Sequence, residues 1–320
     1  MLGELLGEMP NLESLCIRDE DMLYLPDVVE LGPRSLILPK LRDFQLLSSP
    51  SRCATILNAL VHPISQSIQL WFHYHCEDTN ATFGVLGDQL SRNIRPVHLR
   101  VDNHYGLNWE SSGQSATCSG SVEQSLSRLA IRMDDTGASR FRSICETSLL
   151  STLETFHAHR LCFSVNAWRE IFGNLPNLRE IEVWRDGRNL VDALFPTGQD
   201  SDQVLFRKLE TLLLDDQDMA YVGSKMSVVD CGELLECMRI RQSLATPLHK
   251  LDLRNNVFVN DYKVVQLREV VKEVTWDGRS FFKCQGEWNG TAIKEIEQQG
   301  MEFPVIEAQY DDWVASDIVW

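Results

Sequence analysis

The chain has 320 residues, of which 43% are hydrophobic and 24% are charged, a composition typical of folded globular proteins and not of disordered ones. Its 30 Lys and Arg residues are outnumbered by 46 Asp and Glu residues, which gives a formal net charge of −16 at pH 7. This charge would repel a nucleic acid or an anionic membrane, so the composition argues against both as partners.

The sequence carries no recognisable targeting segment. Residues 1–11 lack the basic start and the continuous apolar run of a secretory signal. The longest stretch without Asp, Glu, Lys or Arg, from Cys53 to Cys76, contains too many polar residues to cross a membrane. The nine cysteines are scattered and form no C-x-x-C motif. We therefore expect buried, reduced thiols in a cytoplasmic or nuclear protein.

A short apolar skeleton recurs along the chain. The pattern apolar-Pro-x-Leu-x-x-apolar-x-apolar occurs within residues 8–17, 37–46 and 174–183. Its core, apolar-x-x-apolar-x-apolar, gives ten copies that begin at Leu12, Leu41, Ser65, Ile94, Leu126, Leu153, Leu178, Leu209, Leu248 and Val271. From the first start to the last is 259 residues in nine steps, so the mean spacing is just under 29. Such a period predicts a repeat architecture.

The fourth and sixth positions after each start, which alternate with the apolar residues, are mostly polar, since only six of these twenty residues are apolar. Alternation of this kind predicts short strands with one face in solvent. It argues against a doubly wound sheet, whose strands are buried on both faces.

Helical segments are predicted between the strands. Ser49 and Ser51 are candidate caps for a helix over 53–60, apolar residues at 83, 86 and 90 share a helical face, and residues 228–238 show the same spacing. A strand, a helix and a return within about 29 residues make one solenoid unit, and stacked units share a core.

The skeleton resembles the leucine-rich repeat, most completely at Leu-His-Lys-Leu-Asp-Leu-Arg-Asn-Asn over 248–256. The repeat length resembles the ribonuclease-inhibitor-like subclass, and the Leu/Met-Pro-x-Leu starts resemble the repeat portion of fungal F-box proteins. The resemblance covers residues 5–280. It implies an irregular α/β horseshoe, with parallel strands on the concave face and helices outside. The closing Asn is replaced in the other nine units, and no F-box is recognisable, so a Skp-type adaptor is expected as a partner only if an F-box is supplied elsewhere.

Two segments depart from the repeat. Residues 110–121 are rich in Ser and Gly and predict a flexible loop. Residues 302–320 contain five acids, no base, and Phe303, Tyr310, Trp313 and Trp320. We expect a solenoid of about ten irregular units over 1–280, followed over 281–320 by a cap for its open end or by an acidic-aromatic tail that binds a partner.

The polar positions of the strands predict a binding surface on the concave face. Ten parallel strands would span about 43 Å, which is enough for a protein ligand. The candidate protein-binding residues are Trp71, His98, Arg100, Arg132, His157, His159, Glu182, Trp184, Asp215 and Arg254. Bases and imidazoles dominate the first six units and acids the later ones. Trp and Arg are frequent interface anchors, which favours Trp71, Trp184, Arg100 and Arg132, although a merely solvated sheet face would also be polar.

Catalytic and metal motifs are weak. His73 and His75 would share a strand face and could ligate zinc with Cys76, but no second ligand pair stands at zinc spacing. The chain has no G-x-S-x-G, P-loop, G-x-G-x-x-G or H-E-x-x-H motif.

We therefore expect a non-enzymatic protein-interaction module without a cofactor or a metal. By resemblance, it would be the substrate-recognition part of an F-box-type ubiquitin ligase. The alternatives are a stand-alone scaffold and a metal-dependent enzyme that uses His73, His75 and Cys76.

Overall fold

A computed structural model describes most of the chain between residues 6 and 278. The described residues are 6, 8–18, 36–61, 64, 66–72, 80–103, 128–133, 137–145, 148–159, 161, 163–184, 187–196, 205–215, 231–254 and 259–278. The candidate zinc ligands His73, His75 and Cys76, the loop over 110–121 and the segment over 281–320 lie outside these residues, so the predictions made for them remain predictions.

The core element is one open sheet of ten strands, and every pair of neighbouring strands is parallel. The strands are β1 (Ser14–Arg18), β2 (Asp43–Leu47), β3 (Ser67–Trp71), β4 (His98–Asn103), β5 (Arg128–Met133), β6 (Thr155–His159), β7 (Glu180–Trp184), β8 (Thr211–Asp215), β9 (Lys250–Asp252) and β10 (Glu273–Thr275).

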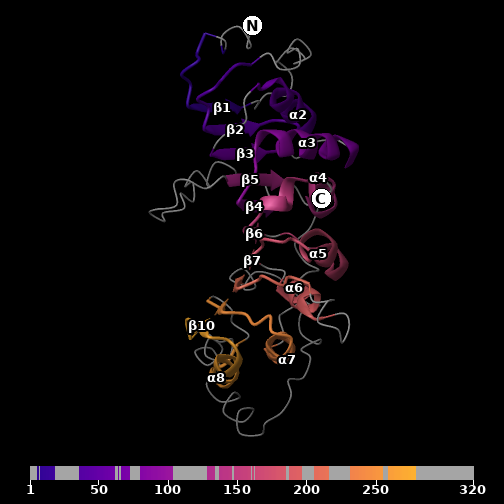
Figure 1. Ribbon diagram of the computed structural model, residues 1–320, viewed down its shortest axis with the longest axis vertical. Helices are drawn as coiled ribbons and strands as arrows, with labels where there is room; N and C mark the ends of the chain where they lie inside the picture. The colour runs from indigo at the N-terminus through magenta and orange to yellow at the C-terminus, as the bar shows by residue number, and fades with distance from the viewer. Residues whose placement is uncertain are drawn as a thin grey trace, which may run out of the picture.

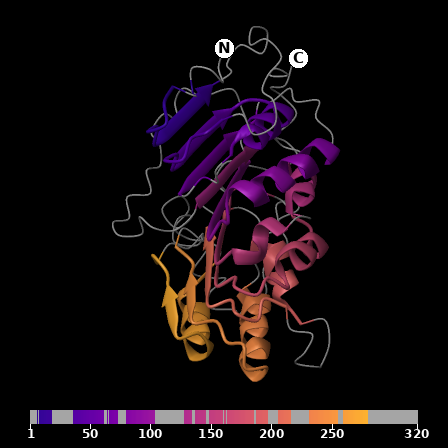
Figure 2. The same cartoon turned by 45° about the horizontal axis from the view of Figure 1, so that its top comes forward.

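The described helices form a second layer on one side of the sheet (Figures 1 and 2). They are α2 (Pro50–Ala59), α3 (Asn80–Asn93), α4 (Gly137–Cys145), the 3₁₀ helix η2 (Ser148–Thr152), α5 (Val165–Phe172), α6 (Gly187–Leu194), α7 (Cys231–Ser243) and α8 (Asp261–Val270). Each successive pair from α2 to α8 is in contact. None of the described helices combines the length and the apolar character needed to cross a membrane. The fold is thus α/β, with an all-parallel sheet and helices in an arrangement compatible with a repeat solenoid.

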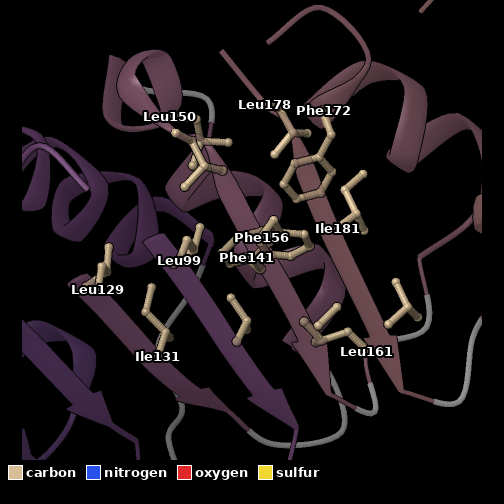
Figure 3. Packing of buried hydrophobic residues seen from close by; sticks show 14 of the residues in the cluster. Leu99, Leu129, Ile131, Phe141, Leu150, Phe156, Leu161, Phe172, Leu178 and Ile181 are labelled. Carbon is tan, nitrogen blue, oxygen red and sulfur yellow. The ribbon is translucent and has the colours of Figure 1, made fainter. Parts of the chain in front are cut away.

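The predicted alternation along the strands is confirmed. In β2, β3, β7 and β8 the residues that face the helices are almost completely buried, while their neighbours are partly exposed. Figure 3 shows Leu99, Leu129, Phe156 and Ile181 on neighbouring strands beneath the helices. Phe156 stacks on Phe172 of α5, with ring centroids 4.2 Å apart, within an aromatic part of this core.

The units begin in the same way, which explains the recurring Pro-x-Leu. The amide of Leu12 donates to the Met9 carbonyl at 3.0 Å, and that of Leu41 donates to the Leu38 carbonyl at 3.2 Å. Pro10 and Pro39 therefore occupy the second position of a β-turn, which their fixed φ favours.

A second hydrogen-bond pattern repeats where each strand starts. One carbonyl accepts from two successive amides of the next strand: the Glu154 carbonyl from Arg179 and Glu180 at 2.8 and 3.0 Å, and the Arg179 carbonyl from Glu210 and Thr211 at 2.8 and 2.9 Å. The same pairing recurs at the carbonyls of Glu13, Arg42, Val97 and Glu210. The stacked units are therefore equivalent in local structure as well as in sequence.

In a simple solenoid the strands would lie side by side in chain order, and the sheet departs from this order at one place. The order in the sheet is β1-β2-β3-β5-β4-β6-β7-β8-β9-β10, so β5 lies between β3 and β4. A parallel return needs about a dozen residues, and the 24 residues between Asn103 and Arg128 exceed this length. Because Leu129 and Ile131 alternate like the residues of every other strand, β5 fits between β3 and β4 without loss of core packing.

The fourth copy of the repeat begins two residues later than predicted. Leu99 pairs with Leu129 and with Phe156, each of which is the fourth residue of its copy, so the fourth copy starts at Pro96 and not at Ile94. The amide of Ile94 donates to the Leu90 carbonyl at 2.9 Å, which continues the bonding of α3. The pattern matched at Ile94 because Val97 lies in phase with Leu99 and Val101.

The predicted helices are present. Ser49 caps α2, since its hydroxyl accepts from the Arg52 amide at 3.4 Å. Phe83, Leu86 and Leu90 form the buried face of α3, and the helix predicted over 228–238 is described as α7 from Cys231 onward.

Candidate functional site

The sheet side that faces away from the helices, called the open face below, carries the side chains between the buried ones. Strand register aligns them in rows. The middle row, in spatial order, is Cys16, Gln45, Gln69, Ala130, Arg100, His157, Glu182, Leu213, Asp252 and Thr275. Nine of the ten predicted residues lie on these strands, and Arg254 lies two residues beyond the end of β9. Their role as ligand contacts on a concave face remains a prediction.

The structure brings some predicted residues together and separates others. Arg100 pairs with His157 in register, and Asp215 pairs with Trp184. Trp71 ends β3, and three strands separate it from Trp184 on β7. This distance is about 19 Å. Two tryptophans so far apart would contact different parts of a ligand.

Two further predicted residues lie in the centre of the sheet. His98 on β4 is aligned with Thr155, and Arg132 on β5 is aligned with Trp71 and Asp102. The side chain of Arg132 lies outside the described part of the chain.

His157 joins β6 to β7 through two carboxylates. Its Nε2 lies 3.4 Å from Glu180 Oε1, and its Nδ1 lies 3.2 Å from Glu182 Oε2. The hydrogen bond from His157 lowers the pKa of Glu180 below its ordinary value of 4.5; burial opposes this shift, and the nearby charges of His157, His98 and Lys250 favour it.

Glu180 is not among the predicted site residues. The predicted residues are the fourth and sixth after the start of each copy, whereas Glu180 is the second after Leu178. The period of two places this position on the same face, so alternation alone could have identified it.

Trp184 is held in place by the same group of side chains. Its Nε1–H donates to Glu182 Oε1 at 2.7 Å, and the ring of His159 meets it edge-on with centroids 4.6 Å apart. Glu182 therefore bridges His157 and Trp184. An aromatic side chain fixed in this way loses little conformational entropy when it binds a ligand.

Asp252 fixes Arg254 at the end of β9. Arg254 Nη2 lies 2.6 Å from Asp252 Oδ2, and Arg254 Nε lies 2.9 Å from both carboxylate oxygens. Asp252 is buried, while the Arg254 side chain is 59% exposed. The hydrogen bond to Asp252 raises the pKa of Arg254, and the charges of Asp215 and Glu182 act in the same direction.

Charge is unequally distributed over the open face. On β1–β6 the described side chains include three arginines and three histidines but one carboxylate: Arg18, Arg100, Arg128, His98, His157, His159 and Asp43. On β7–β10 they include five carboxylates and one lysine: Glu180, Glu182, Asp215, Asp252, Glu273 and Lys250. The predicted polarity is therefore present, and its boundary is the contact of His157 with Glu180 and Glu182.

A small hollow lies on the open face at β1–β3, lined by Cys16, Arg18, Gln45, Leu47 and Trp71 among others. Its volume is about 10 Å³, roughly the space needed for one water molecule. Pockets for small molecules and cofactors usually enclose roughly 300–1,000 Å³, so this hollow is too small for such a ligand.

The described residues contain no group of three or more His, Cys, Asp or Glu side chains arranged to hold a metal ion. His157 and His159 lie on the same face of β6, but His157 contacts carboxylates and His159 contacts an indole.

Comparison with known proteins does not assign the chain to a family. No family model matches it, and no curated protein matches it.

Proposed function

We propose that this chain is a non-enzymatic protein-binding module that holds a protein ligand on its open face. The observation that carries the proposal is the broad, partly exposed strand surface on which Glu182 and His159 hold Trp184 in position. Preorganised tryptophans surrounded by polar side chains are typical of interface hot spots.

The dimensions of the open face favour a protein over a small molecule. Ten strands give a width of about 43 Å, and five residues per strand give a length of about 16 Å. The product, roughly 700 Å², is close to the roughly 800 Å² that each partner buries in a standard interface.

The resemblance to the repeat portion of fungal F-box proteins extends the proposal to substrate recognition for a ubiquitin ligase. A stand-alone scaffold is the alternative. Size-exclusion chromatography of the purified chain mixed with a Skp-type adaptor distinguishes the ligase subunit from the scaffold. Co-elution would support a ligase link through this chain itself. Separate elution would support the scaffold, unless an F-box is supplied elsewhere.

Affinity capture with matched variants tests the binding role. We expect Trp71→Ala with Trp184→Ala to reduce capture of the bound protein by about tenfold or more, because truncated hot spots typically cost at least about 2 kcal/mol. The control is Tyr262→Ala, which removes an exposed aromatic side chain from α8 in the helix layer. Equal capture by all three proteins, or a fall in melting temperature that matches the loss of capture, would contradict the proposal.

A further inference from the structure

The last strand of the sheet, β10, is followed by no helix among the described residues. α8 belongs to the unit that begins at Leu248, and it packs against both α7 and β10, where Leu267 and Val271 are at most 1% exposed. A cap for this end, predicted within residues 281–320, remains a prediction, and the acidic-aromatic composition of residues 302–320 points to a second place where they can bind.

The composition of residues 302–320 matches one half of the open face. The segment has five acids, no base and four aromatic residues. The β7–β10 half carries mainly carboxylates and would repel it. The described side chains of the β1–β6 half include three arginines, Arg18, Arg100 and Arg128, against one carboxylate, Asp43. The same half carries the partly exposed Trp71 and Leu47, so both its charge and its apolar side chains complement the segment.

The chain between the sheet and residues 302–320 is long enough for this segment to reach the β1–β6 half of the open face. The described residues end at Gly278, just after β10, and 23 residues separate Gly278 from Glu302. In the sheet, β4 lies five strands from β10 and β5 lies six, which corresponds to about 24 and 29 Å. A chain of 23 residues reaches at most about 76–83 Å when fully extended, so the segment can reach β4 and β5. Short linkers that can span the distance give effective concentrations of about 1 mM.

We propose that residues 302–320 bind intramolecularly to the β1–β6 half of the open face and occupy it in the free protein, so that a protein ligand must displace them. This inference rests on the proposed function, because it takes the open face to be the binding surface. It makes the acidic-aromatic tail an internal competitor of the ligand.

Limited proteolysis of the full-length protein tests this contact. Chymotrypsin cleaves after Tyr310 and Trp313, and the rate measured by intact-mass spectrometry is divided by the rate for a free synthetic peptide of residues 302–320. We expect wild-type protein at low salt to be cleaved about tenfold more slowly than the peptide, as an effective concentration of about 1 mM and a peptide Kd of about 0.1 mM would give. Arg100→Glu with Arg128→Glu, or about 0.5 M NaCl, should abolish the protection, since both remove the attraction between charges.

A charge swap and a matched control make the test specific. Adding Asp311→Lys and Asp312→Lys to the double arginine variant should restore protection relative to the correspondingly changed peptide. Arg188→Glu with Arg239→Glu reverses two exposed charges on the helix layer and should leave protection intact. Circular dichroism checks that each variant is folded.

Three results would overturn the inference. Residues 302–320 of the wild-type protein could be cleaved as fast as the free peptide, or the Arg188→Glu with Arg239→Glu control could lose as much protection as the Arg100→Glu with Arg128→Glu variant. The third such result is protection from cleavage that rises with protein concentration. The last would assign the contact to a second copy of the chain. If residues 302–320 are cleaved as fast as the free peptide while the protein still captures its partner, only this inference is overturned. If affinity capture does not depend on Trp71 and Trp184, the proposed function alone is overturned.

Discussion

The guanidinium of Arg241 is enclosed in the core, where its Nη2 donates to the Phe206 carbonyl at 2.8 Å and its Nη1 donates to the Leu205 carbonyl at 3.2 Å. Burial lowers the pKa of Arg241. Its neighbour Arg239 lies on the exposed side of the same helix. The sequence does not distinguish the two, because the carbonyls that need a donor are about 35 residues away along the chain.

The cysteines agree only in part with the expectation of buried thiols. The described residues include five cysteines, none of them in a disulfide, and Cys53, Cys231 and Cys237 are buried. Burial raises the pKa of Cys237 to about 12, so this thiol stays protonated at neutral pH. Cys16 is exposed because it occupies an open-face position of β1, the strand at the edge of the sheet.

The contact between Glu180 and His157 predicts a pH dependence of stability. Because the pKa of Glu180 is lowered in the folded protein, its contribution is present above the unfolded value near 4.5 and is lost as the pH falls through the folded value. We expect Glu180→Gln to lower the melting temperature at pH 7 and to match the wild type once Glu180 is protonated. Thermal unfolding followed by circular dichroism from neutral to acidic pH would measure this. A difference between the two proteins that persists at the acidic end would contradict it.

At the scale of the elements, alternation predicted the strands well because one face must be buried and the other must tolerate water. The Pro-x-Leu skeleton marked the turns before β1 and β2 because proline favours the second turn position. The start of the fourth copy was predicted at Ile94, two residues too early, because its alternating run is longer than the skeleton. Such a run fits the pattern in two registers that differ by two residues. Such a slip leaves every side chain on its correct face, so binary pattern cannot detect it.

The two faces of β8 differ sharply, and adjacent leucines test this difference. Leu212 faces the helices and is 0% exposed, whereas Leu213 lies on the partly exposed open face. We expect Leu212→Asp to destabilise the protein by about 4 kcal/mol or more, because it buries a charge in the apolar core. Leu213→Asp should cost about 1 kcal/mol at most, mainly through repulsion by Glu182 and Asp252 on the neighbouring strands. Urea unfolding measures both, and equal losses would show that β8 is buried on both faces.

At the scale of the whole molecule, the resemblance to the leucine-rich repeat predicted a parallel sheet with a helix layer but not the exchange of β4 and β5. Each strand carries the same pattern, so sequence alone does not rank its possible neighbours. The unusual length of the segment between Asn103 and Arg128 was visible, yet a long loop is equally compatible with chain order. The open-face residues of β4 and β5 were therefore predicted correctly, while their neighbours across the sheet were not.

Engineered disulfides distinguish the two strand orders directly. Gln69 on β3 pairs with Ala130 on β5, and Arg100 on β4 lies one strand further in the same row. Paired residues of adjacent strands are about 4.8 Å apart, and residues two strands apart are about 9.6 Å apart. A disulfide requires Cα atoms roughly 4.4–6.8 Å apart, so only the first pair has suitable spacing. We expect Gln69→Cys with Ala130→Cys to link on mild oxidation and Gln69→Cys with Arg100→Cys to stay reduced, as read by mass spectrometry of non-reduced peptides. The native Cys16 lies two strands from Gln69 and does not compete. If the second pair linked and the first did not, β4 would lie beside β3 and the chain would follow a simple solenoid order.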